Sequence, residues 1–305
     1  MHSPIEPSPL QLLRDEVYTE RGVEVYMKRD DMIHPLIQGN KWRKLKYNLE
    51  AARAAGYRRL LTFGGYYSNH LYATAAAASL YGFEAVGVVR GEEPAALSHT
   101  LQFARSRGMR LKFVSRAAYE QRYDVSFLEM LRDTYGDFYL LPDGGSNALA
   151  LRGAGEIISE TGSGFDVVCV PCGTGGTLAG IACALNGSSR IIGFSPLRGN
   201  PALVEEINRL TREYSGCTYS NFTICNDFTF GGYARWTDAL IDFVVSFEAK
   251  HGILLDPIYT SKMMYGINTM IREGKFARGT RLLCIHTGGL QGWGGVKQEK
   301  VKWSG

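Results

Sequence analysis

The stretch WRKLKYNLEAARAAGYRRLLTFGG, residues 42–65, contains the two periodicities that decide the fold. Its first part places apolar residues at helical spacing and stops at Gly56, a residue type that commonly ends helices because it adopts a left-handed backbone. Its second part, RRLLTFGG, is a short continuous apolar run, which predicts a buried strand. A helix that leads directly into a buried strand is typical of α/β proteins.

The same alternation extends along the chain in both directions. VEVYMK (residues 23–28) predicts a strand, and SNHLYATAAAASLYG (residues 68–82) predicts a helix begun by Ser68 or Asn69. Further strands are predicted by EAVGVVRG, RLKFVS, DFYLLPDGG, DVVCVPC, RIIGFSPL and RLLCIHTGG, with helices between them. Because apolar strands are covered on both faces and helical crossovers make neighbours parallel, we expect an α/β protein with two doubly wound, mostly parallel open sheets.

The composition and charge of the chain exclude several classes of function. The chain has 305 residues, of which 45% are hydrophobic and 21% charged, the balance of a soluble globular protein. The net charge of +4 is mild and the basic residues form no single block, so no nucleic-acid partner is expected. No apolar run approaches the ~20 residues of a membrane helix, and the start, MHSPIEPSPLQLL, lacks the pattern of a secretory signal. We expect a cytoplasmic protein without a membrane partner.

Six cysteines lie in the C-terminal half of the chain. Cys169 and Cys172 form one C-x-x-C, but a second pair at zinc spacing is missing, so no metal site is predicted. The pair fits either a redox function or two small hydrophobes in a buried strand, and the apolar context favours the second. A reduced protein agrees with a cytoplasmic location.

Four segments with unusual chemistry follow predicted strands or turns. They are FGGYYSNHL (63–71), CGTGGTLAG (172–180), LLDPIYTSKM (254–263) and CIHTGGLQG (284–292). In open parallel sheets, ligands bind beyond the carboxyl ends of the strands. These segments are therefore the candidate site.

The second segment predicts a phosphate-binding loop. Gly173, Gly175 and Gly176 allow a tight turn that directs several N–H groups to one point, Thr174 and Thr177 add hydroxyl groups, and the following helix adds partial positive charge. The loop is neither a Walker motif nor G-x-G-x-x-G. A plain glycine-rich turn between strand and helix also fits.

The other three segments have two interpretations each. Residues 68–70 fit a carboxylate pocket at a helix start, or simple capping of that helix. Tyr259 and Thr260 fit an aromatic wall, or a core tyrosine after an Asp-Pro turn. The last segment fits a ligand-binding loop, or a C-terminal loop with a hydrogen-bonded His286.

A lysine completes the set. In LIQGNKWRKL (36–45), Lys41 lies at a glycine turn where a helix begins. We expect Arg43 and Lys44 to be solvated residues of that helix; the alternative is that they are cations that lower the pKa of Lys41. A phosphate anchor, a carboxylate pocket, an aromatic wall and a reactive lysine are the parts that pyridoxal phosphate requires.

The motifs KRDD, GNKWRKL, SNH, DGGSNALALRG, GTGGT, LLDPIYTSKM and HTGG, in this order from residue 28 to residue 289, resemble a known family. The chain is similar to pyridoxal-phosphate enzymes of fold type II, the tryptophan synthase β-subunit class, and within it to the branch of 1-aminocyclopropane-1-carboxylate (ACC) deaminase and D-cysteine desulfhydrase. The resemblance implies a small domain, residues 46–152, a large domain, residues 1–45 plus 153–305, a cofactor cleft between them, and a homodimer.

The resemblance also implies roles for individual residues. Lys41 would form the Schiff base with the cofactor, the loop 173–177 would hold its phosphate, and Asn69 would contact its phenolic oxygen. The implied catalytic residues are Lys41, Ser68 and Tyr259. The implied cofactor ligands are Lys41, Asn69, Gly173, Thr174, Gly175, Gly176, Thr177 and Thr260. The implied substrate contacts are Ser68, Asn69, His70, Tyr233, Tyr259 and Thr287.

Two positions bear on the reaction. ACC deaminases carry an acid where this chain has Thr260 and a leucine where it has Thr287. A neutral threonine beside the cofactor ring makes a weaker electron sink than a carboxylate, which suits expulsion of a good leaving group rather than opening of a cyclopropane. We expect α,β-elimination from a small amino acid, D-cysteine to pyruvate, ammonia and sulfide. ACC deaminase, a β-replacement synthase and a non-enzymatic cofactor binder are the alternatives.

Some residues depart from the whole branch. Better-known members have glutamine at Tyr67 and Arg-Gln at Tyr72 and Ala73, and the context FGGYARW around Tyr233 is unusual. Tyr67 and Tyr72 are bulky enough to reshape a substrate pocket, although core packing of Tyr72 on its helix also fits. These positions leave the substrate open.

Overall fold

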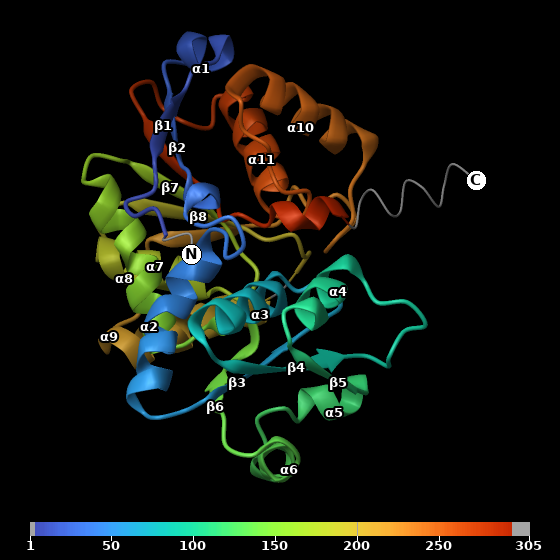
Figure 1. The fold of residues 1–305 in the computed structure, drawn as a ribbon. Coiled ribbons are helices and arrows are strands. Elements are labelled where there is room, and N and C mark those ends of the chain that lie inside the picture. The colour runs from blue at the N-terminus through green and yellow to red at the C-terminus, as the bar shows by residue number, and fades with distance from the viewer. Residues whose placement is uncertain (1–3, 200, 295–305) are drawn as a thin grey trace.

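Two parallel sheets form two lobes in the structure, a computed structural model that describes residues 4–199 and 201–294 (Figure 1). The larger sheet has the order β1-β2-β10-β7-β8-β9. Every pair of neighbouring strands in it is parallel except the pair β1–β2, which is antiparallel. Its strands are β1 (Leu10–Leu13), β2 (Glu24–Lys28), β7 (Val167–Pro171), β8 (Arg190–Phe194), β9 (Phe222–Cys225) and β10 (Arg281–Ile285). The predicted α/β class is confirmed.

The smaller sheet has the order β5-β4-β3-β6 and is parallel throughout. Its strands are β3 (Arg59–Gly64), β4 (Glu84–Arg90), β5 (Arg110–Val114) and β6 (Tyr139–Leu141). Neighbouring residues of β3 serve opposite faces, since Leu60 packs in one apolar cluster and Leu61 in another. Both faces are therefore covered, which explains the continuous apolar runs.

Helices cover both faces of each sheet (Figure 1). The larger sheet packs against α1 (Glu16–Arg21), α10 (Asp238–His251) and α11 (Thr260–Arg272) on one face, and against α7 (Ala148–Thr161), α8 (Gly176–Leu185) and α9 (Pro201–Ser215) on the other. The smaller sheet lies between α2 (Asn40–Ala54), α3 (Asn69–Tyr81) and α4 (His99–Ser106) on one side and α5 (Arg116–Glu120) and α6 (Val125–Tyr135) on the other. Short 3-10 turns are η1 (Asp30–Met32), η2 (Asp143–Gly145) and η3 (Leu290–Gly292).

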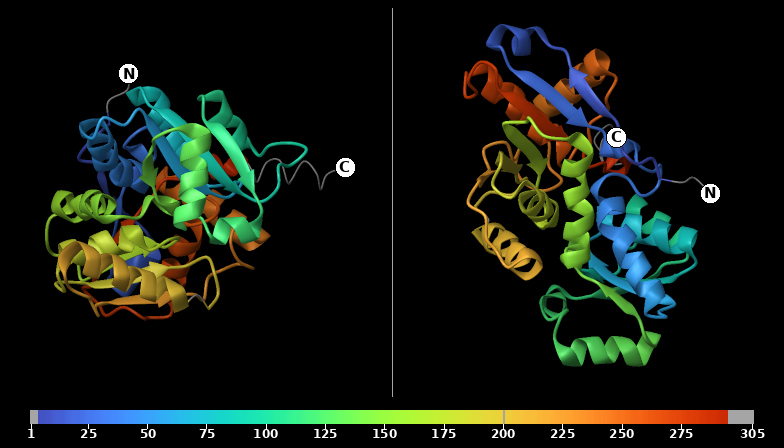
Figure 2. Two further views of the ribbon diagram at one scale, coloured as in Figure 1. Left: turned by 90° about the horizontal axis from the view of Figure 1, so that it is seen from below. Right: turned by 90° about the vertical axis from the view of Figure 1, so that its left-hand side faces the viewer.

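The helices α2 and α7 join the two lobes, and they pack against each other (Figure 2). Their contact is close, because a Cβ atom on Gly153 would lie only 1.8 Å from the carbonyl oxygen of Arg43. The predicted boundaries at 45/46 and 152/153 fall inside these two helices. The strands of the smaller sheet all lie between residues 59 and 141, and the split at 46–152 stays a prediction.

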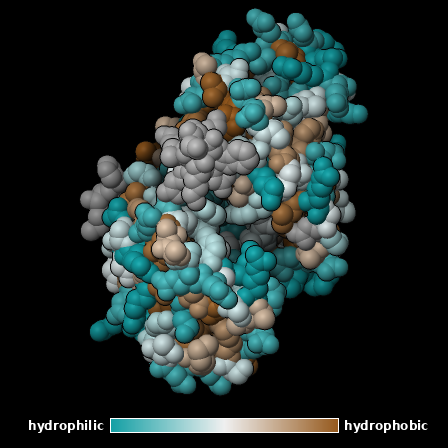
Figure 3. All heavy atoms as spheres, turned by 90° about the vertical axis from the view of Figure 1, so that its right-hand side faces the viewer, coloured by the Kyte–Doolittle hydropathy of each residue, from teal (hydrophilic) through white to brown (hydrophobic). Residues whose placement is uncertain are grey.

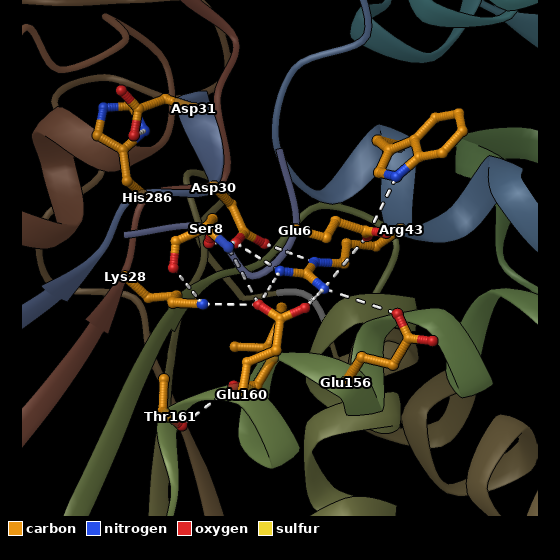
Figure 4. A network of polar contacts seen from close by, with 12 residues as sticks. Glu6, Ser8, Lys28, Asp30, Asp31, Arg43, Glu156, Glu160, Thr161 and His286 are labelled. Carbon is orange, nitrogen blue, oxygen red and sulfur yellow. Dashed lines mark hydrogen bonds and ion pairs between the residues drawn. The ribbon is translucent and has the colours of Figure 1, made fainter. Parts of the chain in front are cut away.

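The expectation that Arg43 and Lys44 are solvated is wrong. Their side chains are 0% and 3% exposed, because α2 is enclosed by α7 on one side and α3 on another. Arg43 donates two hydrogen bonds to Asp30, at 3.1 and 3.0 Å, and further ones to Glu160 (Figure 4). Lys28 pairs with Glu160 from the other side, at 2.6 Å. A helix between two lobes leaves its cations little solvent, so Arg43 is paired with carboxylates inside the protein and Lys44 donates hydrogen bonds to Gly144 and Ser146.

Two further expectations concern the state of the cysteines and membrane-spanning helices. All six cysteines are free, and Cys169 and Cys172 are buried. Across residues 4–199 and 201–294, no helix combines the length and the apolar character that crossing a membrane requires.

Candidate active site

A cavity of about 820 Å³ lies where the carboxyl ends of strands from both sheets meet. One wall follows β3, β4, β5 and β6, and the opposite wall follows β7, β8 and β10 and includes the start of α2. Figure 3 shows the recess between the two lobes on one face of the molecule. The cavity brings together these predicted site residues: Lys41, Ser68, Asn69, His70, Gly173, Thr174, Gly175, Thr177, Tyr233, Tyr259 and Thr287.

Lys41 is the second residue of α2, and the glycine before it explains its placement. Gly39 has a φ of +61°, and a Cβ atom there would lie 2.0 Å from the carbonyl oxygen of Thr287. Only glycine therefore allows the loop after β10 to approach the turn that presents Lys41. The lysine amine donates a hydrogen bond to Asn40 Oδ1 at 3.2 Å.

The electrostatics of Lys41 suit a nucleophile. Burial lowers the pKa of Lys41 to about 8, although the negative charges of Asp256 and Asp143 act in the opposite direction. A substantial neutral fraction is then present near neutral pH. A neutral amine is the form that attacks a carbonyl group.

The loop 173–177 forms the N-terminus of α8 and opens into the cavity. Gly175 caps the helix with a φ of +81°, which turns the backbone toward the cavity. Thr177 Oγ1 accepts a hydrogen bond from Asn40 Nδ2 at 2.9 Å, so Asn40 links this loop to the lysine turn. Gly176 lies behind the surface, where a Cβ atom would meet Ser146 Oγ at 2.4 Å.

Lys44 is a second buried cation at the same loop. Its amine donates hydrogen bonds to the carbonyl oxygen of Gly144 and to Ser146 Oγ, both at 3.0 Å, and would lie 2.9 Å from a Cβ atom on Gly176. Burial and then the charge of Lys41 hold the pKa of Lys44 well below its usual range. A phosphate in the adjacent loop would favour the protonated form.

The start of α3 faces the cavity with Ser68, Asn69 and His70. Ser68 caps the helix by accepting a hydrogen bond from the Leu71 N–H at 3.2 Å. Asn69 Oδ1 accepts a hydrogen bond from Gln291 at 2.8 Å, which ties the two lobes together. The first N–H groups of a helix are free to bind an anion such as a carboxylate.

His70 contains a buried ring nitrogen that has no hydrogen-bond partner in the described part of the chain. Thr62 donates its hydroxyl proton to the Leu141 carbonyl, so we assign the proton shared with His70 to Nε2, which lies 2.9 Å from Thr62 Oγ1. Nδ1 is then an acceptor, and no described residue donates to it. Burial and then the charges of Lys41 and Lys44 hold the pKa of His70 well below its usual range.

Two tyrosines form the aromatic side of the cavity. The rings of Tyr233 and Tyr259 meet edge to face with centroids 5.9 Å apart. A Cβ atom on Gly173 would lie 3.1 Å from the hydroxyl of Tyr259, so this tyrosine stands beside the phosphate loop. Burial raises the pKa of Tyr259 well above its usual range, and the hydroxyl stays protonated.

Thr260 and Thr287 have different positions. Thr287 lines the cavity, whereas Thr260 is fully buried and outside the lining. The Thr260 hydroxyl donates to Asp256 Oδ1 at 2.7 Å and accepts from the Asp256 N–H at 2.8 Å. Its one proton is committed to a carboxylate, so this hydroxyl has none to donate to a cofactor ring.

The two unusual tyrosines also differ. Tyr67 lines the cavity, is 39% exposed and lies with its ring 6.1 Å from that of His99. Tyr72 stacks on Phe103 with centroids 3.7 Å apart, as the packing interpretation predicts. Tyr67 is therefore the one of the two that shapes the cavity wall.

Several residues in or beside the cavity received no role from the sequence. Asn40, Arg90 and Asp143 line the cavity, and Ser146 lies beside the 173–177 loop, outside the lining. Two of them lie in DGGSN, a motif without a chemical signature of its own. The carboxylate of Asp143 accepts a hydrogen bond from the Tyr119 hydroxyl at 2.9 Å. No periodicity reveals that this loop meets Thr174, whose Oγ1 lies 2.8 Å from Ser146 Oγ.

These residues fit pyridoxal phosphate. The 173–177 loop and Lys44 match a phosphate dianion, Lys41 offers a partly neutral amine, and His70 Nδ1 offers a buried acceptor without a partner among the described residues. The cavity volume of about 820 Å³ is near the upper end of the roughly 300–1,000 Å³ of ligand pockets, which leaves room for cofactor and substrate together.

Replacing Gly175 by valine should remove most of the bound cofactor. A Cβ atom there would meet Ile207 Cγ1 at 2.7 Å, and the positive φ strains any other residue, so the loop must move. Two or three charge-assisted hydrogen bonds to phosphate would be lost, on the order of several kcal/mol. Cofactor absorbance after dialysis measures the loss. Gly187→Val is the control, since Gly187 has a φ of +82° and nothing within 4 Å. Equal occupancy in the two variants would contradict the anchor.

Comparisons with known proteins identify the family of the chain. The sequence pattern of the family "Pyridoxal-phosphate dependent enzyme" matches residues 2–288. A Pyrococcus horikoshii protein, named provisionally as a 1-aminocyclopropane-1-carboxylate deaminase, is 31% identical over 295 residues, 93% of this chain and 90% of that one. The D-cysteine desulfhydrase of Salmonella choleraesuis is 29% identical over 305 residues, 93% of this chain and 92% of that one.

A solved structure supports the same assignment. The crystal structure of an ACC deaminase homologue superposes with a TM-score of 0.85 at 29% sequence identity, covering 99% of this chain and 95% of that one. The match therefore includes both lobes and the cavity between them. The chain belongs to the pyridoxal-phosphate dependent enzymes of fold type II, in the branch that contains ACC deaminase and D-cysteine desulfhydrase.

Proposed function

We propose that the protein is an α,β-eliminating lyase that converts D-cysteine, or a similar β-substituted small amino acid, to pyruvate, ammonia and sulfide or another leaving group. The observation that carries this proposal is that Thr287, a residue with a polar side chain, lines the cavity at a position where a leucine would suit the methylene groups of a cyclopropane. The similarity to a D-cysteine desulfhydrase supports it.

The roles of the residues follow from their positions. Lys41, with its lowered pKa, takes the α-proton of the substrate. Ser68 and the free N–H groups at the start of α3 hold the substrate carboxylate. Tyr259 stays protonated and donates to an oxygen or to the leaving group. Pyridoxal phosphate, when bound, supplies an electron sink for the negative charge that develops at the α-carbon.

ACC deaminase is the second candidate, and Asp256 favours it. This carboxylate is 0% exposed and accepts hydrogen bonds from the N–H groups of residues 258–260 and from the Thr260 hydroxyl. It places a negative charge in contact with the hydroxyl of Thr260. Thr260 is the position at which ACC deaminases have an acid. Such a charge would strengthen the electron sink through Thr260.

Product analysis separates the two candidates. The purified protein should be incubated with D-cysteine, L-cysteine, β-chloro-D-alanine and ACC, and ammonia and α-keto acid should be measured without a second substrate. Pyruvate from D-cysteine and β-chloro-D-alanine, with little product from ACC, is the expected result. Preferential release of 2-oxobutyrate from ACC would instead establish the second candidate.

Thr287→Leu should lower D-cysteine turnover by roughly 3–10-fold, the worth of one hydrogen bond, and raise any ACC turnover. Thr287→Val, which keeps the shape and removes the hydroxyl, separates polarity from bulk. Thr260→Glu should not be combined with Thr287→Leu in this test, because the new carboxylate would face the buried carboxylate of Asp256. Steady-state kinetics on both substrates measure the effect, and unchanged kcat/KM in both variants would remove Thr287 from the argument.

Two earlier expectations remain proposals of the same kind. We propose a homodimer, supported by the family resemblance, and light scattering after size-exclusion chromatography tests it. We also propose a cytoplasmic location, supported by the free cysteines.

A further inference from the structure

We infer that the substrate has a second acidic group, carried on its β-substituent and bound by Arg90 with Arg116. This inference rests on the proposed function and narrows its substrate class. It starts from the wall of the cavity that the smaller sheet provides, where two arginines lie that have no assigned task.

The topology of the smaller sheet places these arginines beside the substrate pocket. In the order β5-β4-β3-β6, the carboxyl end of β3 leads to Ser68, the end of β4 carries Arg90, and the end of β5 leads to Arg116. Arg90 is therefore one strand away from the start of α3, and Arg116 is two strands away, at about 4.8 Å for each step. All three line the same cavity.

Arg90 reaches toward the loop that starts at β3. A Cβ atom on Gly65 would lie 4.0 Å from Arg90 Nη2, so the guanidinium stands beside the turn that leads to Ser68. The Cζ atom of Arg90 lies over the ring of Tyr119, 5.6 Å from its centroid, and this cation–π contact helps to position the side chain. Tyr119 is itself held by its hydrogen bond to Asp143 at 2.9 Å.

Neither arginine is neutralised by the part of the chain that the structure describes. Arg90 and Arg116 donate no hydrogen bond and form no ion pair there, whereas Arg43, Arg59 and Arg209 each pair with a carboxylate. Two acidic residues also line the cavity, but Asp143 is bound to Tyr119, and Glu92 is exposed and unpaired with either arginine. Two free guanidinium groups on one cavity wall suit an anionic ligand group, because their planar donors match carboxylate and phosphate.

The α-carboxylate of the substrate is not the group that these arginines bind. In the proposed function the N–H groups at the start of α3, one strand away, bind the α-carboxylate. A longer substrate would place a carboxylate, sulfonate or phosphate at the arginines, and the cavity of about 820 Å³ accommodates such a length. In the elimination, the Cβ–X bond breaks, X keeps the electron pair, and substrate plus one water gives pyruvate, ammonium and the protonated leaving group HX.

The experiment uses two substrates that differ only in the second acidic group. S-carboxymethylcysteine carries a carboxylate where S-ethylcysteine carries a methyl group, and both enantiomers are tested on the holoenzyme. We expect at least tenfold higher kcat/KM for the carboxymethyl compound. Arg90→Gln should lower that value roughly 10–100-fold while changing the value for S-ethylcysteine less than threefold. Arg116→Gln should show the same selectivity with a smaller loss.

Arg58→Gln is the matched control, since Arg58 is an exposed arginine of the same lobe outside the cavity lining. An equal loss for both substrates would mean that Arg90 serves the shared α-carboxylate, and it would overturn the inference, as would no loss at all. Failure of the proposed function is separate: no product would form from D-cysteine or β-chloro-D-alanine either. In that case substrate binding, measured from the cofactor absorbance, tests the inference. Arg90→Gln must weaken the binding of S-carboxymethylcysteine and leave that of S-ethylcysteine unchanged. If neither compound binds, the inference is wrong.

Discussion

Replacing Lys41 by alanine should abolish turnover, with kcat reduced by at least 10²–10⁴-fold, the usual contribution of a positioned acid–base group. Lys41 both attaches the cofactor and takes the substrate proton in the proposed function, so its loss removes two steps. Borohydride treatment of the unchanged protein should fix the cofactor to the peptide that contains Lys41. Activity assays and peptide mass spectrometry measure the two effects.

Two other lysines whose pKa is lowered by burial make this a discriminating test. Burial also lowers the pKa of Lys262 to about 8 and holds that of Lys44 well below its usual range. Lys262 donates hydrogen bonds to the carbonyl oxygens of Thr229 and Gly232, at 2.8 and 2.7 Å, away from the cavity lining. A low pKa alone would therefore not select Lys41, and label on either of the other two lysines would refute the assignment.

The pH dependence follows from the same geometry. The neutral amine is the reactive form, and burial lowers the pKa of Lys41 to about 8, so cofactor-free protein should recombine with pyridoxal phosphate faster as the pH rises toward 8. Above that value the rate should level off. An exposed lysine would show the same rise near its ordinary pKa of about 10.4. Recovery of cofactor absorbance against pH measures the midpoint, and a midpoint near 10 would contradict the enclosed position of Lys41.

Replacing Arg43 by methionine should destabilise the protein by about 3–5 kcal/mol, the usual cost of removing one partner from a buried ion pair. Arg43 is 0% exposed and donates to Asp30, which is also 0% exposed, and to Glu160 (Figure 4). Without the guanidinium, Asp30 would keep, among the residues that the structure describes, only Ser8 Oγ as a side-chain donor, at 2.6 Å. The melting temperature should fall by on the order of 10 °C.

Arg209→Met is the control for this substitution. Arg209 also forms two ion pairs, with Glu206 at 2.8 Å and Glu213 at 2.7 Å, but its side chain is 56% exposed. Solvent screens these pairs, and their loss should cost at most about 1 kcal/mol. Thermal unfolding of both variants in the holo form compares them directly. A similar decrease in the two melting temperatures would mean that burial of the network contributes little.

The sequence by itself determined the central strands of the larger sheet and all four strands of the smaller one. Runs such as RRLLTFGG and DVVCVPC are mostly apolar on consecutive positions because both faces of these strands are covered, and that signal is local. The two strands that sequence analysis missed, β1 and β9, lie at the two edges of the larger sheet. Their residues are mostly exposed or half-exposed, so they lack the continuous apolar run that identifies a buried strand.

The candidate site divides in the same way. The glycine loop at 173–177 and the lysine after Gly39 were identifiable because close backbone approach restricts the residue type at each position. The burial of Arg43 and Lys44 was not, since it depends on α7 and α3 packing against α2 from distant parts of the chain. The environment of Thr260 was open for a related reason: its hydroxyl could face a ligand or Asp256, and the tertiary structure turns its proton toward Asp256.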